Sequence, residues 1–439
     1  MTITILGLGY GDPRALTLEA NDALQNAREI FLRTREHPTV AALPNHLRVH
    51  SFDHLYAALG DPSPSLRTGF DAIYTAIADD ILARAARGDV LYAVPGHPLF
   101  GEISAQKILA RAREQSIATR VIAGVSFVDA ACAALTLDPL ARGLQIADAT
   151  DLARQHFPHL DPDQPALIGQ LYSRAVASDC KLTLLALYPP EHHVTRVDAA
   201  GTPAQKIAAL PLAELDRADD FGLLTTVYLP PLARAGGLSA LGEVVAHLRA
   251  PEGCPWDREQ THQSLRRDLL EECYEVLETL DANDLPHLRE ELGDLLLHVF
   301  LQAQIASEFG EFLLTDVIAE IAEKLVRRHP HVFGNAQVNS TDEIIANWER
   351  IKQSEKNGAP KESPIPRALP ALARAQKIAK RRKAKATIKE LEAAVKKLSR
   401  ARNRAETLGE VLFALAAYAA AKQIDAESAL RRAAAQRIG

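Results

Sequence analysis

The hydrophobic pattern of this 439-residue chain changes character once, near residue 240. Before that point, short β-rich runs alternate with helical patterns, with strands expected at 2–6, 89–94 and 120–124 and helices at 17–31 and 104–115. After it the strand signals vanish, and long amphipathic helices are expected at 262–281, 285–309 and 314–328. Alternating strands and helices are typical of an α/β domain, whereas helices alone are typical of an all-α domain. The sequence therefore predicts a multidomain protein with an N-terminal α/β domain and a C-terminal helical bundle.

Two stretches set the expected domain boundaries. The turn-rich "YLPPLARAGG" (228–237) closes the α/β region, and "GAPKESPIPRALP" (358–370) is a proline-rich linker. We expect an α/β domain at 1–229, a linker at 230–240, a helical domain at 241–357, a linker at 358–370 and a helical tail at 371–439.

The tail contains a degenerate copy of part of the helical domain. "TLGEVLFALAAYA" (407–419) echoes "ELGDLLLHVFLQA" (291–303), with Gly409 aligned on Gly293. The copy keeps the apolar positions and loses acidic ones, because Thr407 replaces Glu291 and Glu410 replaces Asp294. The basic run at 374–404 favours a solvated helical face over a nucleic-acid or acidic-partner surface.

Composition excludes several broad classes. The net charge of -6 does not favour a nucleic-acid partner, and no apolar run approaches the length of a membrane span. The N-terminus is expected to be a strand rather than a signal peptide, and the four scattered cysteines are typical of buried or idle thiols in a reducing cytosol. We therefore expect a cytoplasmic protein with no membrane contact.

Paired acids are the strongest chemical signal. Glu272 and Glu275 lie three residues apart in one expected helix, Glu291 and Asp294 repeat that spacing in the next, and Glu271 lies beside them. Residues at this spacing share a helix face. Acids clustered among apolar neighbours repel one another and lose hydration, and a hard divalent cation with oxygen ligands relieves both penalties. We expect Mg²⁺, with Mn²⁺ as an alternative, rather than zinc. A solvated acidic face is the rival reading, but few bases accompany these acids.

These residues carry a family resemblance. "EECYE" (271–275) and "ELGD" (291–294) resemble the EExxE…ExxD motif of the MazG nucleoside triphosphate pyrophosphohydrolases. The flanking segments 248–272, 324–334 and 347–356 also resemble that family. The resemblance implies an all-α fold, a homodimer or higher homo-oligomer formed through the helical domain, and hydrolysis of a nucleoside triphosphate to a monophosphate and diphosphate.

The resemblance also suggests roles for individual residues. Glu272, Glu275, Glu291 and Asp294 would hold the metal, with Glu271 as a general base or further ligand. Basic side chains would contact phosphate oxygens (Lys324, Arg327, Arg328, Lys352), although a solvated helix face explains each alone equally well. Trp256 and Trp348 would stack on the base, and a packed core position is the alternative for each. His329 and His331 are expected to be structural or close to phosphate.

Three glycine turns distinguish the N-terminal region. "ILGLGYGDP" (5–13), "YAVPGHPLFGE" (92–102) and "VIAGVSFVDAACAAL" (121–135) together resemble the tetrapyrrole methylases, which use S-adenosylmethionine. The resemblance implies a cofactor cleft lined by these turns and by two weaker additions, with candidate residues Gly9, Gly11, Asp12, Pro95, Gly96, His97, Ser126, Phe127, Leu171 and Tyr172.

The sequence thus predicts a Mg²⁺-dependent nucleoside triphosphate pyrophosphohydrolase fused to a methyltransferase module, an arrangement that resembles the bacterial YabN-type proteins. Two alternatives stay open. One is an S-adenosylmethionine-dependent methyltransferase with an accessory helical domain, and the other is a non-catalytic nucleotide-binding or assembly protein.

Overall fold

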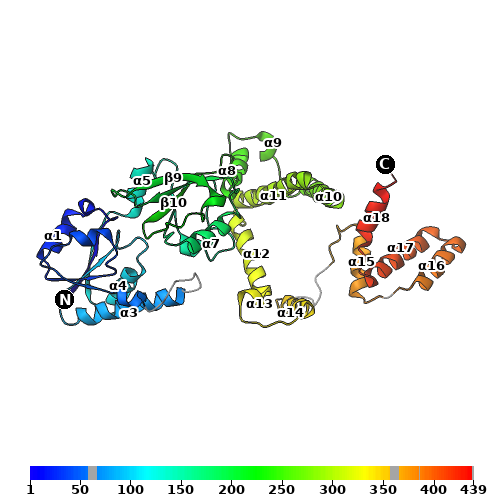
Figure 1. Ribbon diagram of the computed structural model, residues 1–439. Helices are drawn as coiled ribbons and strands as arrows, with labels where there is room; N and C mark the ends of the chain where they lie inside the picture. The colour runs from blue at the N-terminus through cyan, green and yellow to red at the C-terminus, as the bar shows by residue number, and fades with distance from the viewer. Residues whose placement is uncertain (58–66, 356–364, 385, 438–439) are drawn as a thin grey trace. The chain divides into compact units, whose positions relative to one another are not determined.

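The computed structural model describes residues 1–57, 67–355, 365–384 and 386–437. The chain forms two compact units, Met1–Val244 and Val245–Gly439, which we call the N-terminal unit and the helical unit. In Figure 1 the N-terminal unit runs from blue to green, and the helical unit continues from green to red.

The first half of the N-terminal unit is built on a parallel sheet of order β3-β2-β4-β1-β5. Its strands are β1 (Thr2–Gly7), β2 (Glu29–Leu32), β3 (Arg48–Ser51), β4 (Val90–Val94) and β5 (Ala118–Ile122). The helices of this half are α1 (Leu18–Asn26), α2 (Asp53–Ala57), α3 (Arg67–Ala85), α4 (Ile103–Glu114) and α5 (Phe127–Leu135).

Apolar side chains cover both faces of this sheet. Ile5 and Phe31 belong to the core beneath α3 and α4, whereas Leu6 and Ile30 belong to the core beneath α1. Such two-sided burial is typical of parallel sheets, whose connecting helices cover both faces. It also explains one wrong prediction. The helix expected at 17–31 ends at Asn26, because residues 30–32 are buried in succession as strand β2 instead of lying on one helical face.

The second half of the N-terminal unit contains a mixed sheet of order β6-β7-β10-β8-β9. Its strands are β6 (Gln145–Asp148), β7 (Ala166–Gly169), β8 (His193–Asp198), β9 (Lys206–Pro211) and β10 (Thr225–Leu229). Helices α6 (Ala149–Leu152) and α7 (Arg174–Leu184) accompany it, and α7 contributes Val176, Ala177, Cys180 and Leu184 to its core.

The segment expected to be a linker is attached to the N-terminal unit. The backbone N–H groups of Gly236 and Gly237 donate to the Asp163 carboxylate at 2.8 and 2.9 Å, and the Ser239 hydroxyl donates to Asp161 at 2.6 Å. These bonds fix the chain where α8 (Leu238–Arg249) begins.

The helical unit contains helices and connecting segments without strands among its described residues. Its first group comprises α9 (Pro255–Arg258), α10 (Arg266–Ala282), α11 (Leu285–Glu308), α12 (Leu314–Arg328), α13 (Pro330–Phe333) and α14 (Thr341–Ser354). The tail forms α15 (Ala371–Arg381), α16 (Ile388–Arg400), α17 (Arg404–Ala421) and α18 (Ala426–Ala435). The helices expected at 262–281, 285–309 and 314–328 are present with small shifts at their ends. No helix in the described parts of the chain is long and apolar enough to cross a membrane.

Candidate functional site

A tight hairpin between α10 and α11 positions the paired acids. Asn283 ends α10 in the left-handed conformation, with φ of 55°. Asp284 then caps α11 by accepting the backbone N–H of His287, and Pro286 occupies the first turn, where its missing N–H costs little. The two helices pack against each other, so that Glu272 and Glu275 of α10 meet Glu291 of α11.

The three carboxylates form one cluster. One oxygen from each of Glu272, Glu275 and Glu291 lies within 4.8 Å of the other two. Partial burial, a hydrogen bond to Glu275 and the charges of Glu275, Asp294 and Glu291 raise the pKa of Glu272 to about 7. Burial and the charge of Glu275 likewise raise the pKa of Glu291. Asp294 therefore lies close enough to act electrostatically, whereas Glu271 is exposed and stands outside the cluster.

The donor set fits a hard divalent cation. It consists of oxygen atoms alone, as Mg²⁺ and Mn²⁺ prefer, with no sulfur or imidazole ligand within the cluster. Burial is the largest cause of the raised pKa of Glu272, and the neighbouring charges raise it further. All of its charged neighbours that contribute to this shift are acids.

The degenerate copy in the tail has lost this character. Thr407, which replaces Glu291, is buried and donates to the Asn403 carbonyl at 2.9 Å. Glu410, which replaces Asp294, is paired with Lys397 at 2.9 Å. Among the described residues, the α10–α11 cluster is the single group of three potential metal ligands.

Three of the four predicted phosphate-binding residues lie towards the ends of α12 and α14, together with Trp348, which was predicted to stack on the base. Glu355 pairs with Arg327 at 2.8 Å and with Arg328 at 2.6 Å. The Arg328 guanidinium lies 5.3 Å from the centre of the Trp348 ring, and the Lys352 ammonium lies 4.6 Å from it. This places four of the predicted residues in one basic cluster, which we call the α12–α14 cluster.

Other predicted residues of the helical unit lie outside this cluster. Lys324 is half-buried one turn before Arg328. Trp256 is 66% exposed on α9, and it has no cation–π partner among the described residues. His329 and His331 contact each other as tilted rings, and His329 Nδ1 donates to the Leu325 carbonyl at 2.7 Å, so both have local structural partners.

In the N-terminal unit, the glycine turns meet at the carboxyl edge of the parallel sheet. Gly9 and Gly96 form an antiparallel bridge, with N···O distances of 3.2 and 2.8 Å, and both have positive φ angles. Sequence reasoning missed two further glycines. A Cβ at Gly124 would lie 2.2 Å from the Gly96 carbonyl oxygen, and one at Gly7 would lie 2.5 Å from it. The backbones after β1, β4 and β5 therefore pack closer than any side chain allows.

The polar side chains predicted to bind the cofactor near these turns make hydrogen bonds to residues close to them in the chain. The Asp12 carboxylate caps a short turn and pairs with Arg14, which lowers its pKa. Ser126 and Asp129 form a capping box that starts α5. His97 accepts the Leu99 backbone N–H and contacts the edge of Phe100, while Pro95 is half-buried before it.

Two of the remaining candidates lie where the two halves of the N-terminal unit meet, and two belong to the second half. Phe127 packs on Gly169 at the end of β7, where an added Cβ would come within 2.9 Å of the ring. Gly11 faces Leu224 and Pro38, which line a pocket of about 300 Å³. Leu171 is fully buried in the core of the second sheet, so its side chain is not available to line a cleft. Tyr172 is half-buried against that core.

A buried ion pair near the carboxyl edge of the parallel sheet could not be predicted from the sequence. The Arg33 Nε atom lies 2.9 Å from a Glu102 oxygen, and burial raises the pKa of Glu102 against the opposing charge of Arg33. The two residues are far apart along the chain and follow different strands, so local spacing could not pair them.

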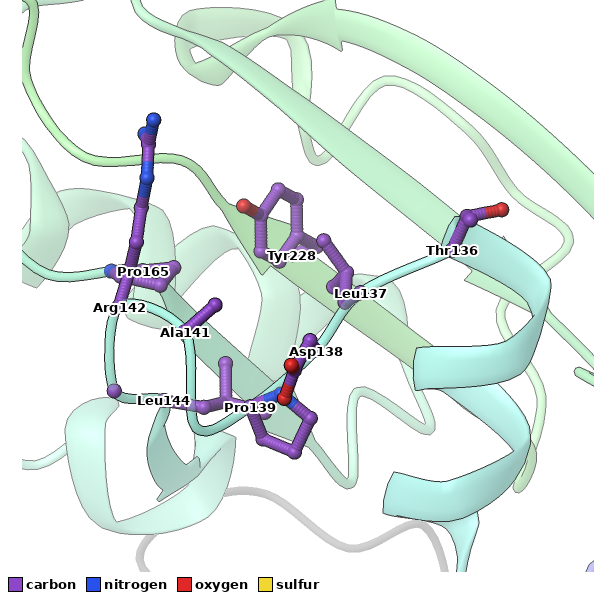
Figure 2. A pocket seen from close by; sticks show the side chains of 10 residues that line it. Thr136, Leu137, Asp138, Pro139, Ala141, Arg142, Leu144, Pro165 and Tyr228 are labelled. Atoms are coloured by element: carbon purple, nitrogen blue, oxygen red, sulfur yellow. The ribbon is translucent and has the colours of Figure 1, made fainter.

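A second pocket, of about 240 Å³, is shown in Figure 2. It lies between the segment from Thr136 to Leu144 and the Tyr228 ring of β10. Arg142 and Asp138 are its charged residues. None of the residues predicted from the sequence lines it.

Comparisons with known proteins match both units. Residues 2–216 match the model of the Tetrapyrrole (Corrin/Porphyrin) Methylases, and residues 260–333 match that of the MazG nucleotide pyrophosphohydrolase domain. The protein YabN of Bacillus subtilis is 40% identical over 385 residues, which cover 86% of this chain and 76% of YabN.

Two further relatives match the helical region. The nucleoside triphosphate pyrophosphohydrolase/pyrophosphatase MazG of Thermotoga maritima is 41% identical over 44% of this chain and 79% of its own length. The nucleoside triphosphate pyrophosphohydrolase of Escherichia coli K12 is 49% identical over 31% of this chain, and the match spans 54% of that enzyme. Both resemblances drawn from the motifs are thus confirmed. In this chain a tetrapyrrole methylase domain precedes a MazG domain, and the chain belongs to the YabN family.

Proposed function

We propose that the helical unit hydrolyses nucleoside triphosphates to nucleoside monophosphates and diphosphate, with Mg²⁺ or Mn²⁺ held by Glu272, Glu275, Glu291 and Asp294. The observation that carries the proposal is the approach of three carboxylates within 4.8 Å, with the pKa of Glu272 raised to about 7. Repelling acids at a helix–helix interface cost stability, and binding of a divalent cation would offset that cost. Two relatives of this region are named for the same reaction.

The residues around the cluster have distinct proposed roles. When bound, a divalent cation supplies charge neutralisation for the triphosphate and acidifies a water for attack. The four carboxylates orient it, and Asp294 completes the set from the next turn of α11. Glu271 is exposed beside Glu272, where it could accept a proton from the attacking water.

We assign phosphate recognition to the basic residues Lys324, Arg327, Arg328 and Lys352, and base stacking to Trp348. Trp348 already lies beneath two cations, which is compatible with an aromatic platform next to phosphate groups. These contacts support the role for Trp348 better than for Trp256, which is exposed on α9.

A homo-oligomer formed through the helical unit is also part of the proposal. Large apolar side chains are exposed on α10, α11 and α12, including Leu270, Leu292, Leu296, Ile318, Ile321 and Leu325. An apolar stripe of this kind is typical of a surface that is covered by another helix.

The test is diphosphate release from a panel of nucleoside triphosphates with Mg²⁺. Wild type should release diphosphate, and the panel identifies the preferred base. A Glu272→Gln/Asp294→Asn double variant should fold and lose at least a hundredfold in kcat. Glu278→Gln is the matched control, because Glu278 is an exposed acid on α10 outside the cluster, and it should keep full activity. Absence of hydrolysis by folded wild type across the whole panel would refute the proposal and favour a nucleotide-binding or accessory role.

A second proposed function concerns the N-terminal unit. We propose that it binds S-adenosylmethionine at the edge formed by Gly9, Gly11 and Gly96, with Pro95, His97 and Phe127 beside them. The positive φ angles of the three glycines support this reading, because they let backbone approach a ligand closely. Calorimetric titration with S-adenosylhomocysteine tests it, and a Gly11→Leu variant should lose binding while Gly88→Ala, in an open turn, should keep it.

A further inference from the structure

The α12–α14 cluster contains an acid that the proposed reaction does not use. Glu355 ends α14, and its carboxylate accepts from the Arg327 Nε at 2.8 Å and from Arg328 through Nε at 3.2 Å and Nη2 at 2.6 Å. The Glu355 side chain is 19% exposed, and both arginines contact its carboxylate. Its two arginine partners lower the pKa of Glu355 to about 2, so it is charged at every pH at which the protein would work.

The two arginines are held differently. Arg328 uses both Nε and a terminal nitrogen on Glu355 and also lies against Trp348, which leaves it little freedom. Arg327 is bonded through Nε alone and is 52% exposed. Its two terminal nitrogens have no hydrogen-bond partner among the residues that the structure describes. Because the side chain is 52% exposed, these nitrogens form a planar pair of donors that can receive two phosphate oxygens.

We propose that Glu355 is a positioning residue, which anchors Arg327 by its Nε so that both terminal nitrogens face a phosphate group of the substrate. The inference rests on the proposed function, because it takes the α12–α14 cluster as the phosphate-binding part of the site. A carboxylate that competed with phosphate would occupy the terminal nitrogens of Arg327, and Glu355 leaves them free. Fixing an arginine before binding lowers the side-chain entropy that binding must remove.

The size of the effect follows from that entropy. Immobilising one flexible side chain costs about 0.5–1.5 kcal/mol, which corresponds to a change of about two- to tenfold in affinity. Loss of Glu355 frees two arginines, so we expect the upper end of this range. The loss should fall on binding rather than on the chemical step, because Glu355 itself does not contact the reacting atoms.

The experiment compares Glu355→Gln with wild type in the full chain. Diphosphate release gives KM and kcat, and calorimetric titration with inorganic tripolyphosphate gives a readout that does not depend on turnover. We expect about a tenfold increase in KM and in the Kd for tripolyphosphate, with kcat within twofold of wild type. The control is Glu320→Gln, because Glu320 is an exposed acid on α12 with no ion-pair partner among the described residues, and it should change none of the three.

A double-mutant cycle sharpens the test. Arg327→Lys keeps the charge and loses the planar pair of donors, so it should weaken tripolyphosphate binding in wild type and much less in Glu355→Gln. An unchanged or lower Kd in folded Glu355→Gln overturns the inference, and a lower one identifies Glu355 as a competitor of phosphate. If wild type hydrolyses nothing but Glu355→Gln still weakens tripolyphosphate binding, the proposed hydrolysis fails and the positioning role stands.

Discussion

Glu272 is the residue whose protonation couples the carboxylate cluster to stability. Its pKa is raised from 4.5 to about 7 by partial burial and by neighbouring acids. Between these two values the native state binds a proton that the unfolded chain releases. The contribution of Glu272 to the free energy of unfolding is therefore fully present below about pH 4.5 and is lost as pH rises to about 7. A bound metal ion favours the ionised carboxylate, so in its presence ionisation of Glu272 no longer lowers the free energy of unfolding.

This gives a prediction for the metal-free protein. In EDTA, the helical unit should be less stable at pH 8 than at pH 5.5, and Glu272→Gln should lose most of that difference. Added Mg²⁺ should restore stability at pH 8 in wild type alone. Both tryptophans lie in the helical unit, so tryptophan fluorescence during urea unfolding follows it selectively. Equal pH dependence in wild type and Glu272→Gln would contradict the coupling.

The same residues show what spacing can and cannot predict. Acids three apart on a helix must share a face, so the meeting of Glu272 and Glu275 follows from the sequence, and a short hairpin brings Glu291 opposite them. The pairing of Arg33 with Glu102 depends on β2 and β4 being neighbours in the sheet. No local pattern contains that information, which is why sequence reasoning missed it.

At the scale of elements, the order of strands and helices was readable, but their packing was not. The sequence predicts too long a helix for α1, because the spacing of apolar residues in 17–31 also fits a helix. In the structure, residues of β2 are buried on both faces, so the segment after Asn26 forms a strand instead. Likewise, Gly9, Gly11 and Gly96 could be picked out from the motifs, whereas Gly7 and Gly124 gain their importance from the contact of three loops.

That contact leads to a prediction for the N-terminal unit. Gly124→Ala should destabilise it by about 3 kcal/mol, because the new methyl group meets a backbone oxygen at 2.2 Å that cannot rotate away. S-adenosylhomocysteine binding should be lost with it. Gly88→Ala meets nothing within 4 Å and should change stability by less than about 0.5 kcal/mol. Far-UV circular dichroism during urea unfolding measures both, and similar midpoints for the two variants would argue against the close approach.

At the scale of the whole molecule, the two units have separate cores. The largest apolar clusters lie within residues 3–229, and the helical unit buries its own set, including Phe300, Leu301 and Ile305. Gly236, Gly237 and Ser239 bond to the N-terminal unit, so the turn-rich stretch belongs with the α/β fold rather than forming a free linker. Compact units with their own cores are expected to fold as separate cooperative blocks.

Because the two units have separate cores, a substitution in one unit should impair the activity of that unit alone. Gly124→Ala should abolish S-adenosylhomocysteine binding and leave both the tryptophan-detected unfolding midpoint and diphosphate release at wild-type values. Glu272→Gln should abolish diphosphate release and leave S-adenosylhomocysteine binding unchanged. Measuring both activities on both variants gives four results. Diphosphate release by Gly124→Ala and S-adenosylhomocysteine binding by Glu272→Gln show whether one unit affects the other. If either substitution impairs the activity of the other unit while that unit stays folded, the units communicate, and the fusion is a coupled enzyme rather than two modules on one chain.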